Sequence, residues 1–410
     1  MFIFISKSCL AKFMTGKIIR NYLPELYALV ISRKKPAMVT VNLTNRCNQR
    51  CIYCELSVNK SDLGDKALSL ADLKWIIDEM AVNKIRRISL CGGEPFLFEG
   101  IIEVIAYAGS KGIRCSVTTN GMTAHKLSDN ALNVLVRYKT QVNISIDSLD
   151  ETIQSFTRGT SSALKNALLA IELLGNKSIP VTVLTAISRY NYHSLSGFLY
   201  QAYEKGIMNI LFQPIIYYSN YPDLPVIERK SELNVPVDKL DILMRELKQI
   251  HLFERTHQIS TNVYRILPWL EFYLKRAAQT EEGWFFTKVV NKFFCREIYA
   301  IIDIAYDGGI QPCGLALATV DIHANRSEGL ISLWSKATEE LKRDMLLGRY
   351  HDFCNGCCHH FSRNMLASVI KYPLQNRNAA IQLGALLAMR FLSVIYKRFL
   401  KKHSKPVRGK

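Results

Sequence analysis

Between residue 37 and about residue 215, short strand-like apolar runs recur, and most are followed by a helical pattern. The runs are Ala37–Leu43, Arg87–Cys91, Arg114–Thr119, Val142–Ile146, Val181–Ile187 and Asn209–Gln213. Strands that alternate with helices at this spacing are typical of βα units around a parallel sheet. The repeat predicts either a partial (β/α)6 barrel of the TIM type or an open doubly wound α/β sheet, and it fits both equally well.

Two of the intervening helices can be read in detail. Ser69 can cap a helix, with Asp72 three residues later completing a capping box. The apolar positions of this helix follow at helical spacing: Leu73, Ile76, Ile77 and Met80. A second apolar row follows Ser162: Leu164, Leu168 and Ile171.

The remaining segments differ from this repeat, and we expect five parts in all. They are a basic amphipathic segment (1–36), the barrel core (37–219), a helical bridging segment (220–290), a cysteine-bearing module (291–362) and a basic helical tail (363–410). The bridging segment has an apolar row at Leu240, Leu243 and Leu247. The module opens with an expected β-hairpin, in which Ile298–Ile304 and Ile310–Cys313 flank the turn Asp307-Gly308-Gly309.

Nearly all of the formal net charge of +18 lies in the two terminal segments. Residues 1–36 hold seven Lys or Arg and one acid, and residues 363–410 hold eleven Lys or Arg and no acid. Basic amphipathic helices predict attachment to the inner face of a membrane, although packing on the barrel explains the same pattern. We expect no nucleic-acid partner, because no recognised RNA-binding module accompanies the charge.

The cellular compartment follows from what the sequence lacks. No stretch of about 20 residues is free of charge, so an ordinary spanning helix is not expected. The opening apolar run is broken by Lys7 and Lys12 before a secretory signal can form. We therefore expect a cytoplasmic protein, peripheral to the membrane at most, whose eleven cysteines are reduced and available to metals.

A first group of cysteines follows the first expected strand. Cys47, Cys51 and Cys54 are spaced as C-x3-C-x2-C. Three thiolates this close on a loop can hold three corners of a [4Fe–4S] cube and leave one iron open to another ligand. The alternative is a zinc site that takes its fourth ligand from elsewhere in the chain.

The segment CNQRCIYC resembles the signature of the radical S-adenosylmethionine (SAM) superfamily, including the aromatic Tyr53 before the third cysteine. Further matches come at the ends of later strands, in the order that the superfamily shows. They are Gly92-Gly93-Glu94-Pro95, Thr119-Asn120-Gly121 and Ser145-Ile146-Asp147, followed by Arg158. The joint match covers about 180 residues and implies the partial barrel rather than the doubly wound sheet.

The resemblance also implies a chemistry and roles for single residues. In this superfamily, SAM binds the open iron, and one-electron reduction releases a 5′-deoxyadenosyl radical that abstracts hydrogen; an electron donor such as flavodoxin or ferredoxin is then needed. Gly92, Gly93 and Glu94 are expected at the methionine amino group. Ser145 is expected at the ribose or carboxylate, and Arg158 at the carboxylate, which its forked guanidinium suits. The remaining positions are Asn120, which supports the pocket, and Tyr53, which lies near adenine or only packs.

A second group, Cys295, Cys313, Cys354 and Cys357, supplies the four thiolates of a closed cluster. A hairpin followed by a CxxC loop resembles the twitch module, a shortened relative of the SPASM domain, which carries one auxiliary [4Fe–4S] cluster. The alternative is a zinc ribbon with His359 or His360 as a ligand. Cys358 can also replace Cys357. Cys91 and Cys115 are expected to be buried apolar residues instead of ligands.

We therefore expect a radical SAM enzyme with an auxiliary cluster, an oxidoreductase or a transferase-like enzyme. Its substrate is a small or lipid-linked metabolite, or, as the alternative, a ribosomal peptide. Only 46 residues precede Cys47, which is short for the peptide-recognition domain found at the front of many peptide-modifying relatives, so the metabolite is preferred. A hypothesis of another class is a non-catalytic zinc-binding membrane adaptor.

Overall fold

Ten strands form one sheet that brings the latest strands of the chain beside the first. The structure is a computed structural model that describes residues 36–54, 56, 64–215, 230–277, 297–314 and 316–346. The sheet order is β10-β9-β8-β1-β2-β3-β4-β5-β6-β7. The strands are β1 (Met38–Asn42), β2 (Arg87–Cys91), β3 (Arg114–Thr119), β4 (Gln141–Ser145), β5 (Val181–Ile187), β6 (Asn209–Pro214), β7 (Ser260–Thr261), β8 (Ile301–Ile304), β9 (Gly309–Gln311) and β10 (Val320–Asp321).

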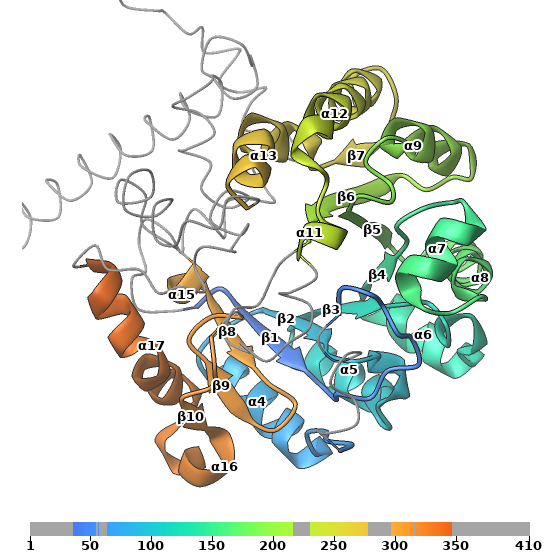
Figure 1. Ribbon diagram of the computed structural model, residues 1–410. Helices are drawn as coiled ribbons and strands as arrows, with labels where there is room; N and C mark the ends of the chain where they lie inside the picture. The colour runs from blue at the N-terminus through green and yellow to red at the C-terminus, as the bar shows by residue number, and fades with distance from the viewer. Residues whose placement is uncertain are drawn as a thin grey trace, which may run out of the picture.

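Most of the helices lie around the outside of the curved sheet, whereas the short α11 lies toward its open side (Figure 1). They are α4 (Leu70–Val82), α5 (Ile101–Ser110), α6 (Asp129–Arg137), α7 (Glu151–Arg158), α8 (Ala163–Asn176), α9 (Leu195–Glu204), α11 (Lys230–Leu233), α12 (Leu240–Glu254), α13 (Val263–Ala277), α15 (Glu297–Ala300), α16 (Ile322–Asn325) and α17 (Leu330–Leu346). Strands β1 to β6 are all parallel, and β8 pairs with β1 in parallel as well. The result is an open, partial TIM-type barrel, as the sequence predicted.

The two faces of the sheet differ sharply in chemistry. The outward face is apolar and packs under the helices: Val39, Val41, Ile88, Leu90, Val117, Val142, Ile144, Val183, Ile210 and Phe212. The inward face carries many small polar side chains: Thr40, Asn42, Ser89, Cys91, Ser116, Thr118, Asn143, Ser145 and Thr182. The register places Asp303, Leu184 and Leu211 on the same face. Successive residues of a strand point to opposite faces, so this alternation fixes which side chains line the barrel.

The expected strands agree closely with the observed ones. The hairpin is also confirmed, because β8 and β9 are antiparallel with Ile304 opposite Ile310. Its start is wrong in detail, since Glu297–Ala300 forms a helical turn rather than a strand. The bridging segment contributes β7, which extends the sheet in parallel beyond β6 and was not expected.

The capping box at Ser69 and Asp72 is present, and α4 buries the expected apolar positions. Ser162 makes no side-chain cap, and the buried face of α8 differs from the expected row. It consists of Ala163, Leu164, Ala167, Ala170 and Leu174. The α12 row is confirmed, with Ile250 added to it.

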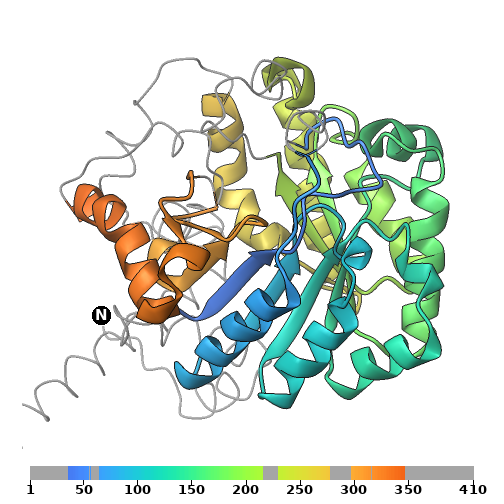
Figure 2. The same ribbon diagram turned by 90° about the horizontal axis from the view of Figure 1, so that it is seen from below.

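The segment that follows the hairpin is attached to α4. Arg326 forms an ion pair with Asp72, and the backbone N–H of Leu330 donates to the Glu79 carboxylate at 2.8 Å. Figure 2 shows this segment, in orange, beside the blue strand β1 and helix α4. The cysteine-bearing module therefore continues the barrel sheet instead of forming a sheet of its own.

The basic terminal segments lie outside the described residues, apart from Pro36. The membrane attachment expected of them stays a prediction. Within the described ranges, no helix combines the length and the apolar character that crossing a bilayer requires.

Candidate functional site

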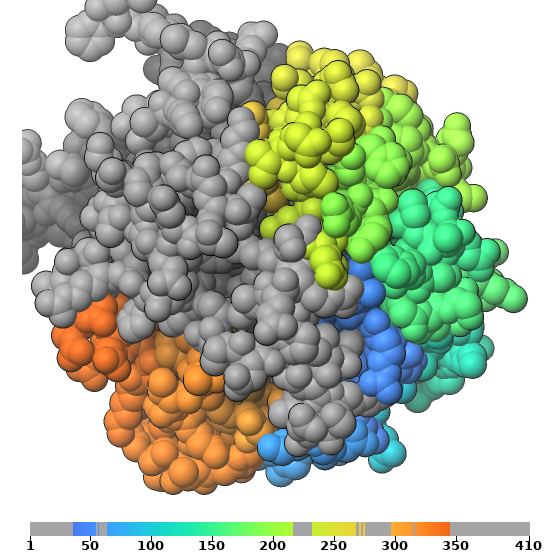
Figure 3. All heavy atoms as spheres, in the orientation of Figure 1, coloured from blue at the N-terminus to red at the C-terminus, as the bar shows by residue number. Residues whose placement is uncertain are grey.

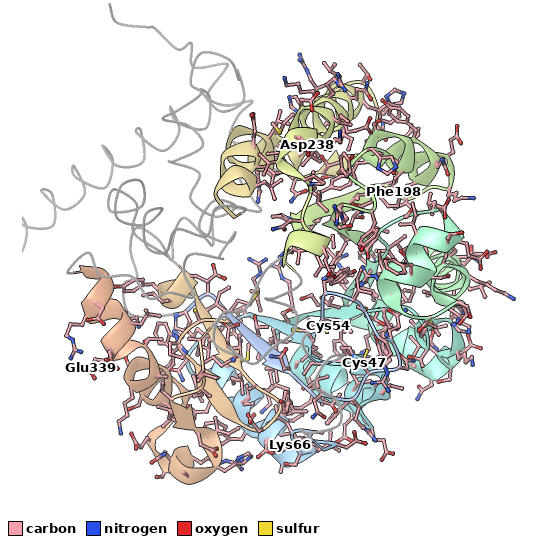
Figure 4. All side chains as sticks on the ribbon, viewed as in Figure 1. Cys47, Cys54, Lys66, Phe198, Asp238 and Glu339 are labelled. Atoms are coloured by element: carbon pink, nitrogen blue, oxygen red, sulfur yellow. The ribbon has the colours of Figure 1, made fainter. Side chains whose placement is uncertain are left out.

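The first cysteine group lies on the loop that leaves β1 at the carboxyl end of the parallel strands. The Leu43 N–H donates to the Cys91 carbonyl at 2.8 Å, so this loop leaves β1 beside the end of β2. The GGEP, Asn120 and Ser145 positions follow the ends of β2, β3 and β4 at the same end of the barrel. The carboxyl ends of barrel strands are where active sites of this fold are built. Figure 4 labels Cys47 and Cys54 there.

Gly92 and Gly93 bring two loops into direct backbone contact. The N–H of Gly93 donates to the Thr44 carbonyl at 2.6 Å, and the N–H of Glu94 donates to the Arg46 carbonyl at 2.7 Å. A Cβ on Gly93 would lie 2.0 Å from the Arg46 oxygen. The absence of a side chain at Gly93 therefore lets this segment pack directly against the backbone of the cysteine loop.

Glu94 is fully buried and joins the ends of β2 and β3. Its carboxylate accepts hydrogen bonds from the Thr119 hydroxyl at 2.7 Å and from the N–H groups of Asn120 at 2.8 Å and Phe96 at 3.1 Å. Burial raises the pKa of this carboxyl, and the three donors offset part of the rise. Because its carboxylate already accepts these three hydrogen bonds, the role of Glu94 is to hold the ends of β2 and β3 together.

Asn120 reaches the cysteine loop from β3. Its side-chain amide donates to the Asn48 side-chain oxygen at 2.7 Å and lies 3.7 Å from the Cys47 sulfur. The backbone N–H of Gln49 also points at Cys47, at 3.5 Å. The supporting role expected for Asn120 is therefore exerted on the loop and on the Cys47 sulfur.

Asp147 is the centre of a buried polar cluster beside the loop. Its carboxylate accepts the Tyr53 hydroxyl, the Arg158 guanidinium at 2.7 Å and the Ala186 N–H at 2.9 Å. The Arg158 guanidinium also lies over the Tyr53 ring, 5.5 Å from its centre. Arg158 is 7% exposed. One guanidinium nitrogen is therefore paired with Asp147, although we expected the group at the SAM carboxylate, and the buried Nε has no partner among the described residues.

The same end of α7 also holds the cysteine loop through its backbone. The carbonyls of Thr157 and Arg158 accept the N–H groups of Ile52 at 3.0 Å and Arg50 at 3.1 Å. Gly159 follows with φ +62°, and a Cβ there would lie 2.2 Å from the Arg50 oxygen. Blue atoms of the loop meet green atoms of this region at the surface in Figure 3.

The hydroxyl groups of Ser145 and Tyr53 differ in whether they form a hydrogen bond within the protein. The Ser145 hydroxyl, half-buried at the end of β4, has no hydrogen-bond partner among the described residues. It is therefore available to a ligand, as the resemblance implies. The Tyr53 hydroxyl is bound to Asp147, which favours the packing role over contact with adenine.

The three thiols form one electrostatic group. Charges on Cys47, Cys51 and Cys54 interact with one another. Burial raises the pKa of Cys47, and it raises the pKa of Cys51 to about 12 although the Arg158 charge opposes it. Both thiols are therefore protonated near neutral pH, and iron would displace their protons on binding. Three thiols on one loop, with N–H donors at the Cys47 sulfur, match the ligand number of a [4Fe–4S] cube with one open corner. In the described structure their side chains do not converge on a single-ion site.

The second cysteine group is described at one position. Cys313 follows β9 and is half-buried. Cys295, Cys354, Cys357 and Cys358 lie outside the described residues, so their assignment stays a prediction. In the described ranges, no three His, Cys, Asp or Glu side chains converge closely enough to surround a single metal ion.

Sequence reasoning missed two residues of this site. Asp147 stood within the Ser145-Ile146-Asp147 motif, but no role was given to it. Gln49 stood between two of the cysteines, and no role was given to it either. An acidic residue at the end of a strand could have marked Asp147 as a candidate site residue. That it binds Tyr53 and Arg158 could be seen only in the folded structure.

An open parallel barrel with a three-thiol loop at the carboxyl end of its strands is the arrangement expected of an α/β protein with an iron–sulfur site. Residues 41–199 match the family model of the radical SAM superfamily, and the chain carries a radical SAM domain. Proteins of this superfamily bind a [4Fe–4S] cluster and SAM, which are the cofactors that the sequence predicted.

Relatives by sequence match part of the chain. Fe-coproporphyrin III synthase of Methanosarcina barkeri is 25% identical over 226 residues, which is 55% of this chain and 55% of that protein. Sporulation killing factor maturation protein SkfB of Bacillus subtilis is 28% identical over 282 residues, or 68% of this chain and 60% of that protein. The chain thus spans little more than half the length of these relatives.

Solved structures share the fold over a larger part of the chain. SuiB of Streptococcus suis, in its crystal structure bound to S-adenosylmethionine, is similar with a TM-score of 0.56 and 14% identity. The similarity covers 83% of this chain and 75% of SuiB. At this identity the likeness concerns the fold.

Proposed function

We propose that the chain is a radical SAM enzyme in which Cys47, Cys51 and Cys54 hold the SAM-binding [4Fe–4S] cluster. The observation that carries the proposal is the position of these three thiols on one loop, with Cys51 buried and Cys47 and Cys54 half-buried. Their charges interact, and the loop leaves β1 at the carboxyl end of the barrel, where Ser145 ends β4. When bound, SAM and the reduced cluster supply a 5′-deoxyadenosyl radical that abstracts hydrogen from the substrate.

The residues of the chain then have separate tasks. Gly92 and Gly93 hold the cysteine loop against the end of β2, and Asn120 donates toward the Cys47 sulfur. Ser145 offers a free hydroxyl to the ribose or carboxylate of SAM. Arg158 keeps its charge within the Asp147 cluster, so we propose that it stabilises the site by electrostatics without touching the SAM carboxylate.

The inward face of the barrel supports a polar substrate. Many of the side chains on this face are hydroxyls and amides, and Asn143 donates to the Thr118 hydroxyl at 3.2 Å. A lipid tail placed against them would leave polar groups unpaired, which costs about 1–3 kcal/mol for each buried group. We therefore propose that the reacting part of the substrate is polar, even if the substrate is attached to a lipid.

A peptide is the second candidate substrate. Two observations favour it: SkfB is named a maturation protein, and SuiB has also been crystallised with its precursor peptide SuiA. The polar inward face can pair with peptide N–H and carbonyl groups as well as with the hydroxyls of a metabolite. A small metabolite and a peptide thus remain competing substrates of one proposed radical chemistry, and both need an external reductant.

Replacing all three cysteines, Cys47, Cys51 and Cys54, by Ala tests the proposal. The variant should lose one cluster and all reductive SAM cleavage, measured as 5′-deoxyadenosine formed with dithionite under anaerobic conditions. The control is Cys115→Ala, which removes a buried thiol of β3 away from the loop. 5′-Deoxyadenosine production by the triple variant would rule out this cluster as the source of the radical.

We propose further that Cys295, Cys313, Cys354 and Cys357 hold an auxiliary [4Fe–4S] cluster. The position of Cys313 directly after the hairpin supports it, since a hairpin and a later CxxC loop carry this cluster in twitch modules. Two cubes predict about eight iron and eight sulfide per chain. Cys313→Ala should lower the iron content and leave SAM cleavage detectable, whereas zinc in that position of the anaerobically prepared protein would contradict the assignment.

A further inference from the structure

Gln49 lies between two of the proposed cluster ligands and is 2% exposed. Its backbone N–H points at the Cys47 sulfur at 3.5 Å. Its side-chain oxygen accepts the Cys51 thiol, with 3.7 Å between sulfur and oxygen. One residue therefore contacts the sulfur atoms of two cysteines, once through the main chain and once through the side chain.

The other half of the Gln49 side chain is unpaired. Its amide nitrogen Nε2 is buried and has no hydrogen-bond acceptor in the part of the chain that the structure describes. A buried donor without a partner costs about 1–3 kcal/mol, so such groups are uncommon in folded proteins. This donor is on the amide that already contacts Cys51, so a half-turn of the amide would offer it an acceptor in the Cys51 sulfur.

The chemistry of Cys51 identifies that acceptor. As a thiol, Cys51 donates its proton to the Gln49 oxygen. As an iron ligand it is a thiolate with no proton to give, and its sulfur accepts only. A half-turn of the terminal amide exchanges oxygen and nitrogen without changing the volume of the side chain. That turn replaces an oxygen-to-sulfur contact between two acceptors by an N–H to sulfur hydrogen bond.

We propose that Gln49 is a positioning residue that donates its side-chain N–H to the iron-bound Cys51 sulfur and thereby raises the reduction potential of the SAM-binding cluster. The inference rests on the proposed function, because it takes Cys51 as a ligand. Hydrogen bonds to the sulfur atoms of a cluster stabilise its more negative, reduced form. The Cys47 sulfur has two N–H groups directed at it, from Gln49 and Asn120, so the proposed bond gives Cys51 a comparable environment.

Gln49→Met tests the proposal, because methionine keeps the length and removes both polar atoms. The matched control is Gln201→Met, at an exposed position of α9. The midpoint potential is measured by electron paramagnetic resonance (EPR) during a redox titration, on the cluster whose signal changes when SAM is added. At a fixed solution potential, the ratio of reduced to oxidised cluster should fall roughly threefold to tenfold in Gln49→Met, where tenfold corresponds to about 59 mV for one electron. It should not change in Gln201→Met.

A second measurement uses wild-type protein, so it does not depend on whether a variant folds. Wild-type protein labelled with ¹⁵N in its glutamine side chains should show a ¹⁵N coupling to the reduced SAM-binding cluster in pulsed EPR. An unchanged midpoint potential in an iron-loaded Gln49→Met variant, or a wild-type cluster without that coupling, overturns the proposal and leaves the proposed function standing. If the wild-type protein forms no cluster that responds to SAM, the proposed function fails and this inference falls with it.

Discussion

Asp147→Asn should destabilise the protein far more than the same substitution at an exposed aspartate. The Asp147 carboxylate is 1% exposed and faces the guanidinium of Arg158 at 2.7 Å. Asparagine keeps the size and can still accept hydrogen bonds from Arg158 and the Ala186 N–H, but it removes the negative charge. Arginine does not lose its proton in proteins, so a buried positive charge is left without compensation. Breaking a buried pair in this way costs about 3–5 kcal/mol.

The assay is thermal unfolding of the iron-loaded protein under anaerobic conditions. For a cooperative unit of 150–250 residues, each kcal/mol lowers Tm by about 2–4 °C, so a decrease of about 6–20 °C is expected. Asp129→Asn is the control, because Asp129 pairs with Lys177 at an 84% exposed position and such pairs contribute about 0–1 kcal/mol. Heat also releases clusters, so each variant is compared at equal iron content.

A second variant separates charge from packing. Arg158→Met in the Asp147→Asn background removes the uncompensated charge, so the double variant should be more stable than the sum of the two single changes predicts. Additive effects, or a decrease in Tm for Asp147→Asn no larger than that of the control, would refute the view of Asp147 as the counter-charge of this cluster.

Three further changes test other parts of the structure. Gly93→Ala should abolish iron loading at the first cysteine group, because its Cβ would lie 2.0 Å from the Arg46 oxygen, whereas Gly197→Ala, with open space around it, should keep full iron content. Asp72→Ala should lower stability by about 1–3 kcal/mol in thermal unfolding, because it removes the carboxylate half of the α4 capping box and the contact with Arg326, and an effect equal to that of Asp129→Ala would contradict this. The full chain should sediment with anionic liposomes at low salt and less so at high salt, and deleting residues 376–410 should weaken binding with both clusters retained. Absence of binding at low salt would mean that the basic tail serves another purpose.

The barrel could be predicted from sequence because each of the strands β1 to β6 carries a local signal, which the two-residue strand β7 does not. Val39 and Val41, like Ile88 and Leu90, alternate with polar residues, and this alternation is fixed by strand geometry alone. The predicted row of α8 was incomplete: Leu164 is buried and Leu168 and Ile171 pack partly buried against the core, but the sequence did not predict the alanines, such as Ala167, that are fully buried. Gly121 explains the choice: a Cβ there would lie 2.9 Å from the Ala167 Cα, so this contact admits small residues only.

The site was predictable in its ligands but not in its contacts. The cysteine spacing and the strand-end motifs each lie within a short stretch of sequence. The side-chain contacts join residues that are far apart in the sequence: Tyr53 and Asp147 are 94 positions apart, and Asn120 and Cys47 are 73 positions apart. No local pattern could show that Arg158 would pair with Asp147, because an arginine thirteen residues after Ser145 suits a substrate carboxylate equally well.

The cysteine loop is fixed by its backbone rather than by its side chains. On one side, Thr44 and Arg46 accept N–H groups from Gly93 and Glu94, and on the other, α7 and Gly159 hold the main chain around Arg50. A loop held in this way keeps its three sulfur atoms in place whatever side chains stand between them. Those intervening positions are therefore free to vary the chemistry around the sulfur atoms without moving them. Gln49 occupies such a position, and the proposed N–H to sulfur bond would give its buried, unpaired amide nitrogen a partner when Cys51 binds iron.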